Sequence, residues 1–170
     1  MTLQSCSQEV KMLAYKGLIR PILEYACAAW DPHQQYLQEK LEMVQRQAAR
    51  FIASNYSREP GSVTKIMSEL KIEPLFEKRK RSRLLLLCKG LHQQAAIPTD
   101  QLQRPKRKTR NMHQEHFINI STRTDTLKAS FLPNTIRDWN HLPSVIINKI
   151  KAAKSPVESF AAIPKNGVGY

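Results

Sequence analysis

Few side chains in this sequence have the types and spacing that metal binding or catalysis requires. His113 and His116 lie three residues apart with Glu115 between them, which is a metal-ligand spacing on a helix. No cluster of cysteines or carboxylates stands nearby to complete such a site. The alternative interpretation is that both histidines have only a structural role. The sequence predicts neither a metal nor a cofactor.

Enzyme signatures are missing as well. The sequence holds no GxSxG, Walker loop, CxxC or HExxH pattern. A two-metal polymerase or nuclease needs carboxylates that hold two ions about 3.5–4 Å apart, and no Asp-Asp pair occurs. Between residues 78 and 128 the only acidic side chains are Asp100, Glu115 and Asp125. We therefore expect this chain not to be an enzyme.

The distribution of charge points instead to a polyanionic partner. Residues 1–77 carry nine basic and nine acidic side chains, whereas residues 78–128 carry thirteen basic and three acidic ones, a local excess of +10. Residues 129–170 add five basic and two acidic side chains, which brings the net charge to +13. A basic region of this density is typical of proteins that bind nucleic acid through its phosphates.

Two short clusters hold most of these cations, five within residues 78–83 and five within residues 104–110. The alternative interpretation is a solvated helix face followed by a flexible loop. Lysine and arginine neutralise phosphates and make binding dependent on salt. The candidate phosphate-contacting residues are Lys78, Arg79, Lys80, Arg81, Arg83, Lys106, Arg107, Lys108, Arg110 and Arg123.

Three aromatic residues lie in or near the basic region. Phe117, Phe131 and Trp139 could stack on unpaired bases, a contact that contributes about 1–3 kcal/mol where it occurs. The alternative is that each of them packs in the core.

The elements that must position these residues are predicted to be helices. Apolar side chains recur at helical spacing, and Pro21 is expected to end or kink the first helix. Asp31 followed by Pro32 is typical of a helix start, with Asp31 as the N-cap. The predicted helices cover residues 9–30, 32–54, 63–70, 74–94 and 145–154, and residues 131–139 are expected to form a short helix or a turn.

The second of these helices has the clearest apolar stripe, at steps of four and three residues. We expect the stripe to be core, and its members are Leu37, Leu41, Val44, Ala48 and Phe51. Residues 116–121 alternate apolar and polar side chains, which allows one short strand or hairpin.

The fold class predicted from these elements is mainly α: a small helical domain with an irregular basic connection. The expected segments are a helical thumb-like part (1–94), the basic connection (95–128), a C-terminal helical part (129–163) and a frayed tail (164–170).

Five stretches in this order resemble the region downstream of the polymerase core in reverse transcriptases of non-LTR, LINE-type retrotransposons. They are YKGLIRPILEYACAAWDPH (Tyr15–His33), LEMVQRQAARFI (Leu41–Ile52), LFEKRKRSRLLLLCKGLH (Leu75–His92), TRTDTLKASFLPNTIRDWNHLP (Thr122–Pro143) and SPVESF (Ser155–Phe160). Each motif is modest in itself, and their order makes the resemblance specific. It covers about residues 12–160.

The resemblance implies an origin in an endonuclease–reverse transcriptase polyprotein, an RNA-directed DNA polymerase. The family's catalytic Tyr/Phe-x-Asp-Asp motif lies upstream of the matched region, and Met1 falls just before that region. We therefore expect a truncated remnant without a catalytic centre. Its implied role is to help hold RNA or an RNA–DNA hybrid. In the alternative of a fragment that does not fold alone, the apolar stripe instead packs against a polymerase core absent from this sequence.

Two alternatives belong to other classes. The chain could be a helical protein-interaction module that docks a partner through the apolar stripe, or a non-functional fragment that does not fold alone. No stretch approaches the ~20 apolar residues that a membrane span needs. The three cysteines are odd in number and far apart, which indicates reduced, intracellular thiols. Lys106 to Lys108 after Pro105 resemble a nuclear import signal; such matches are common by chance, so the expected location is intracellular and the nucleus is one option.

Overall fold

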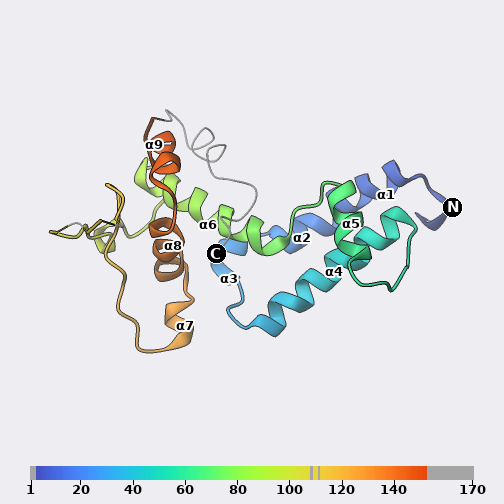
Figure 1. The fold of residues 1–170 in the computed structure, drawn as a ribbon, viewed down its shortest axis with the longest axis horizontal. Coiled ribbons are helices and arrows are strands. Elements are labelled where there is room, and N and C mark those ends of the chain that lie inside the picture. Colours follow the sequence, from blue (N-terminus) through green and yellow to red (C-terminus); the bar gives the residue numbers. More distant parts are fainter. Residues whose placement is uncertain (1–2, 108, 111, 153–170) are drawn as a thin grey trace. The chain divides into compact units, whose positions relative to one another are not determined.

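The computed structural model describes residues 3–107, 109–110 and 112–152, and this part of the chain is mainly α-helical, as the sequence predicted (Figure 1). It divides into two compact units. The first comprises the chain up to residue 27 together with residues 32–78, and the second comprises residues 28–31 together with the chain from residue 79 onward. The four segments predicted from the sequence were drawn from its composition and helix pattern, not from spatial contacts, and they remain predictions. Residues 153–163 of the C-terminal segment and the tail 164–170 lie outside the described residues.

The first unit begins with a helical run that continues through Pro21. A short turn, η1 (Leu3–Ser5), precedes α1 (Gln8–Ala14), which passes into a π-helical turn, η2 (Tyr15–Ile19), and then into α2 (Arg20–Glu24). The wider π turn stands just before the proline, which lacks an N–H and whose ring crowds the preceding turn. The predicted kink is thus a local widening, and the run ends at Glu24, shortly before the left-handed Ala26 (φ 48°).

Two further helices complete this unit: α4 (Gln35–Ala53) and α5 (Ser62–Glu69). The small core consists of Tyr15, Ala48 and Ile52, with Met12, Leu70 and Ile72 packed against it.

The buried face of α4 differs from the apolar stripe that was predicted as core. Among the five stripe residues only Ala48 is buried, while Val44 is 43% exposed and the remaining three (Leu37, Leu41 and Phe51) are half-buried. The buried positions are Gln45, Ala48, Ala49 and Ile52. The stripe is rotated because Gln45 is the buried hydrogen-bonding residue of this helix: its Oε1 accepts from the Tyr15 hydroxyl (3.0 Å) and its Nε2 donates to the carbonyl of Glu73 (2.8 Å).

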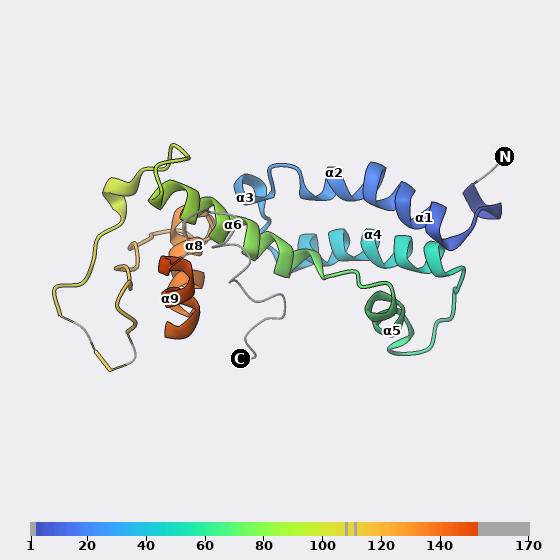
Figure 2. The ribbon, with the colours of Figure 1, turned by 90° about the horizontal axis from the view of Figure 1, so that it is seen from above.

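The second unit is built on three helices that surround one apolar core (Figures 1 and 2). They are α6 (Leu75–Leu91), whose first four residues belong to the first unit, α8 (Phe131–Asn140) and α9 (Ser144–Ala152). The core residues are Leu84, Leu87, Cys88, Phe117, Leu132, Ile136, Trp139, Leu142, Ile147 and Ile150. The smaller elements are η3 (Thr99–Gln101) and α7 (Asp125–Lys128), in the second unit, and α3 (Cys27–Trp30), whose first residue belongs to the first unit.

The connection between α6 and α8 is irregular, as predicted, apart from η3 and α7. The strand considered for residues 116–121 does not form, and no strand is assigned anywhere in residues 112–122. The alternation there has another cause: Phe117 enters the core while Ile118 stays 45% exposed. None of the helices in the described residues is long and apolar enough to cross a bilayer.

Candidate nucleic-acid interface

The first basic cluster, on α6, is largely buried. Arg79 is 2% exposed, Arg81 8% and Arg83 6%. The alternative of a solvated helix face does not hold for these three arginines, because they are buried, and the phosphate contacts predicted for them stay predictions. Four consecutive leucines follow them on α6, and the packing of this helix on several sides removes the arginines from water together with the leucines.

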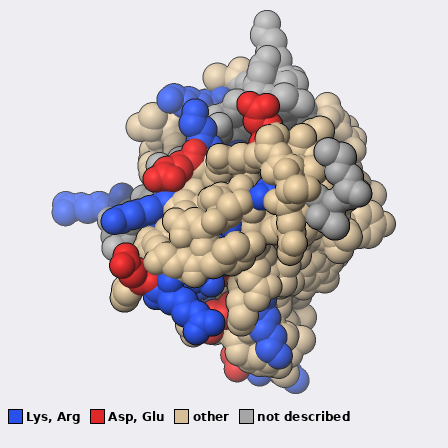
Figure 3. Space-filling model, turned by 90° about the vertical axis from the view of Figure 1, so that its right-hand side faces the viewer, with Lys and Arg blue, Asp and Glu red and all other residues tan. Residues whose placement is uncertain are grey.

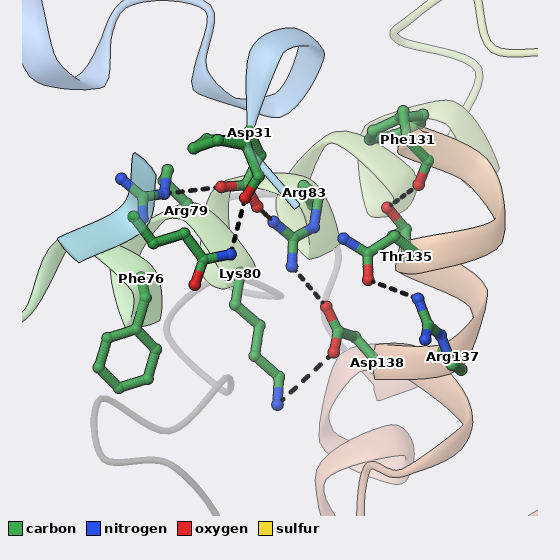
Figure 4. Close-up of polar contacts among 12 residues, drawn as sticks. Asp31, Phe76, Arg79, Lys80, Arg83, Phe131, Thr135, Arg137 and Asp138 are labelled. Atoms are coloured by element: carbon green, nitrogen blue, oxygen red, sulfur yellow. Dashed lines mark hydrogen bonds and ion pairs between the residues drawn. The ribbon is translucent and has the colours of Figure 1, made fainter. Parts of the chain in front are cut away.

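Two internal carboxylates form ion pairs with Arg79, Lys80 and Arg83 of this cluster in the second unit (Figure 4). The Nε atom of Arg79 lies 2.8 Å from Oδ1 of Asp31. Arg83 pairs with Asp31 through one nitrogen and with Asp138 through another, Nη2, at 2.8 Å. Lys80 lies 3.7 Å from the other carboxylate oxygen of Asp138. Buried charges require such partners because desolvation of each ion costs several kcal/mol.

Asp31 therefore serves a purpose other than the predicted helix cap. The N-cap of α4 is Gln34, whose side chain makes no capping hydrogen bond. The carboxylate of Asp31 instead belongs to the second unit, where it binds two arginines of α6.

Lys78, the first cation of the cluster, belongs to the first unit. Its ammonium group pairs with Glu24, which also binds Arg20 at 2.5 Å. Lys78 and Lys80 are half-buried, so the phosphate contacts predicted for them stay predictions. The ion pairs to Glu24 and Asp138 already satisfy much of their charge.

The second basic cluster has a different setting. We call residues 104–112 the basic loop; it carries five basic and no acidic side chains. Lys106, Arg107 and Arg110 are exposed and form no ion pair with any residue that the structure describes. Lys108 lies outside the described residues. In Figure 2 the connection from α6 reaches away from the helices here before it returns toward α8.

The base of the basic loop is closed. The amide of Ile118 donates to the carbonyl of Gln103 at 2.8 Å, which joins the chain before the loop to the chain after it. Arg104 and Glu115 form an ion pair across the same base, with side-chain exposures of 60% and 10%. The cations at positions 106, 107 and 110 thus project from a closed loop.

Arg123, the last predicted phosphate contact, is exposed and precedes α7. Thr124, the next residue, caps α7 by accepting a hydrogen bond from the amide of Leu127 at 3.2 Å. Within the described part of the chain, Arg123 forms no ion pair. Its guanidinium is therefore open to a ligand.

The aromatic residues considered for base stacking are core residues. Phe117 and Trp139 are each 2% exposed, their ring centroids lie 6.0 Å apart, and Phe131 is half-buried against the same core. Stacking by Phe117 and Trp139 is therefore excluded in this fold, because a base needs an open ring face. The exposed side chains available for nucleic-acid contact in this region are therefore those of lysine and arginine.

The two histidines lie at the base of the basic loop. The Nε2 atom of His113 is 3.2 Å from the carbonyl oxygen of Trp139, and the two imidazole rings meet edge to face at 5.4 Å. Burial lowers the pKa of His113 below its usual 6.5. Burial also lowers the pKa of His116, and the neighbouring His113 and His141 lower it further. Over the described residues, no group of three His, Cys, Asp or Glu side chains could hold a metal ion.

Sequence reasoning missed the acidic partners and the fastening residues of this region. They are Asp31, Glu115, Asp138 and Asn140. One signal was present, since arginines beside a run of four leucines must find carboxylates if the helix is buried. Which carboxylates these are depends on the tertiary fold, because Asp31 and Asp138 lie far from α6 in the sequence.

Comparison with known proteins identified no relative: no family model, curated protein or solved structure matches this chain.

Proposed function

We propose that this chain contacts the phosphate backbone of nucleic acid, as the C-terminal segment of a LINE-type retrotransposon reverse transcriptase without its catalytic centre. The observation that carries the proposal is the basic loop. Lys106, Arg107 and Arg110 are exposed there, on a closed loop, without a carboxylate among the described residues to neutralise them. The order of the motifs that resemble this family, and the excess of positive charge after residue 78, support the same role. The proposed partner is RNA or an RNA–DNA hybrid.

The test compares two triple variants that change the net charge equally. The first replaces the loop cations (Lys106→Gln, Arg107→Gln and Arg110→Gln), and the second replaces three exposed cations of the first unit (Arg46→Gln, Arg58→Gln and Lys65→Gln). Binding to a labelled RNA–DNA hybrid is measured between about 50 and 200 mM salt.

The loop variant is expected to bind more weakly at every salt concentration. Its slope of log K against log salt should flatten by about 0.7–0.9 for each phosphate that it no longer neutralises. The matched variant should keep the wild-type slope. Equal weakening in both variants would show that only the overall charge matters, and salt-independent or absent binding by the wild type would overturn the proposal.

A helical protein-interaction module is the second candidate function, and one observation favours it. Large apolar side chains are exposed along α1, η2, α2 and the residue that caps α2: Leu13 at 72%, Leu18 at 65%, Ile22 at 75% and Tyr25 at 80%. Figure 3 shows the side of the molecule that lies at the right of Figure 1, where much of the surface is uncharged and charged residues of both signs lie mostly toward its edges. Self-association in size-exclusion chromatography that Ile22→Glu abolishes would support this function, and a monomer at all concentrations would count against it.

A further inference from the structure

The returning end of the basic loop is fastened to the end of α8 by two adjacent side chains. The indole Nε1 of Trp139 donates to the carbonyl of Glu115 at 2.8 Å. The side-chain amide of Asn140 engages both backbone groups of Phe117: its Oδ1 accepts from the amide at 3.0 Å and its Nδ2 donates to the carbonyl at 2.8 Å. The Asn140 side chain thus bonds the backbone N–H and C=O of Phe117 in the way that a neighbouring strand would.

This fastening is anchored in the core of the second unit. Trp139 and Phe117 are both 2% exposed and belong to the same apolar cluster as the buried residues of α6. Asn140 is the last residue of α8, and its Nδ2 also lies 3.1 Å from Oδ1 of Asn119. Backbone groups held in this way are satisfied by fixed partners rather than by water, so the segment after the loop has little freedom to move.

The departing end of the loop is tied to this fixed segment. The Gln103 carbonyl accepts from the Ile118 amide, and Arg104 pairs with Glu115. Both ends of residues 104–112 are therefore attached to one another and, through Trp139 and Asn140, to α8. These contacts determine where the loop cations lie.

We infer that Asn140 and Glu115 are positioning residues that preorganise the basic loop for phosphate binding. The inference rests on the proposed function of the loop. A loop that is already closed loses less conformational freedom when it binds, and affinity rises by the amount of that saving. Neither residue needs to touch the ligand.

Replacement of Glu115 distinguishes two explanations, because its effect on charge and its effect on loop position predict opposite changes in the affinity for nucleic acid. A carboxylate at the base of a cationic loop repels phosphate, so its removal should strengthen binding if charge alone matters. If Glu115 holds the loop closed through Arg104, its removal should weaken binding. Asn140 is neutral, so its replacement by the similarly shaped leucine changes position without a change in charge.

The experiment measures binding of the full chain to a labelled RNA–DNA hybrid for Asn140→Leu, Glu115→Gln and Arg107→Gln. We expect Asn140→Leu to weaken affinity about tenfold and Glu115→Gln about threefold, both with the wild-type salt slope, because the cations are still present. Arg107→Gln should weaken affinity and flatten the slope by about 0.7–0.9. Tighter binding by Glu115→Gln, or unchanged binding by Asn140→Leu, would overturn the inference.

Limited trypsin digestion separates loosening of the loop from general unfolding. Trypsin cleaves after lysine and arginine, so the rate of cleavage at the loop's own basic residues measures how readily the loop opens. Asn140→Leu should speed cleavage after Arg107 and Arg110 severalfold, while cleavage after the buried Arg79 and Arg83 stays slow, because local opening costs less than opening the core. Faster cleavage at all four sites would mean that the variant only destabilises the unit, and this too would overturn the inference. If the wild type binds no nucleic acid while the loop alone is cut faster, the proposed function fails and the fastening of the loop stands.

Discussion

The Nη2 atom of Arg83 on α6 lies 2.8 Å from Oδ2 of Asp138 on α8, and both side chains are largely buried, at 7% and 15% exposure. The same guanidinium binds Asp31 through its other nitrogen. A buried guanidinium between two carboxylates is stable only while both remain charged, because the desolvation of each ion must be offset by its partners. The ion pair therefore fixes α6 against α8 in the second unit.

Asp138→Asn should destabilise the second unit strongly. The amide keeps the shape of the side chain but removes the negative charge that faces Arg83 and Lys80. We expect the free energy of unfolding to fall by about 2–4 kcal/mol, slightly less than for a fully buried pair because Asp138 keeps some contact with water. Denaturant unfolding followed by tryptophan fluorescence measures this decrease, because Trp139 is buried in the same unit.

Lys106→Gln is the matched control. Its side chain is exposed and forms no ion pair with a described residue, so the free energy of unfolding should change by no more than about 0.5 kcal/mol. Similarly small decreases in both variants would mean that the carboxylate of Asp138 does not stabilise the unit.

The burial of α6 shows how far the sequence could predict this fold. Pro74 correctly marks the start of the helix, which ends at Leu91, three residues before the predicted end. The run of four leucines correctly indicates burial, since Leu84 and Leu87 are core residues. The burial of the neighbouring arginines could not be derived from the sequence in the same way. Whether an arginine faces water or a carboxylate depends on residues that are distant in sequence, here Asp31 and Asp138.

The buried face of α4 shows a second limit. Periodicity places the helix within a few residues of its observed bounds, but the predicted stripe includes Val44 and omits Gln45, whereas in the structure Val44 is exposed and Gln45 is buried. A glutamine can be buried where its two amide atoms meet a hydroxyl and a backbone carbonyl. For the candidate interface, sequence alone located the exposed loop cations but gave no sign of Asn140 or of the closed base.

Tyr15→Phe should destabilise the first unit. Tyr15 is 3% exposed, and its hydroxyl donates to Gln45, which is 1% exposed. Removal of the hydroxyl leaves a buried amide oxygen without its donor, at a cost of about 1–3 kcal/mol. Hydrogen exchange of α4 amides measures the effect, and Tyr56→Phe, at an exposed tyrosine of the same unit, should leave the exchange rates unchanged.

An alkaline titration tests the environment of Tyr15 directly. Burial raises the pKa of its phenol from 10.0 to about 12. The folded state therefore favours the neutral phenol, and the stability that this adds is complete below the unfolded value and is lost as pH rises through the folded one. A tyrosinate absorbance band that titrates late in the wild type and is missing from Tyr15→Phe would match this expectation; disappearance of an early-titrating band would contradict it.

The second unit should lose stability on mild acidification because of His113 and His116. The pKa of each is lowered in the fold, chiefly by burial. The unfolded chain thus binds more protons just below 6.5, so the stabilising contribution of the neutral rings is complete above that value and disappears as pH falls toward the folded pKa. Unfolding measured between about pH 7.5 and 5.5 should show a falling free energy.

His113→Gln should flatten that pH dependence. A glutamine can still donate an N–H to the Trp139 carbonyl but does not take up a proton. His92→Gln, at an exposed histidine of the same unit, is the control and should keep the wild-type profile. An unchanged profile in His113→Gln would show that this ring does not set the acid sensitivity.

The three thiols should react in an order that reports whether the cores are formed. Cys88 is 1% exposed, and burial raises its pKa from 9.0 to about 11, so little of the reactive thiolate exists at neutral pH. Cys27 is buried as well, while Cys6 is half-buried. Alkylation followed by mass spectrometry should label Cys6 first, and Cys88 at least about a hundredfold more slowly until denaturant is added, because its modification requires opening of the core. Equal rates for all three thiols without denaturant would contradict a formed second core, and would support the alternative that this chain is a fragment that does not fold alone.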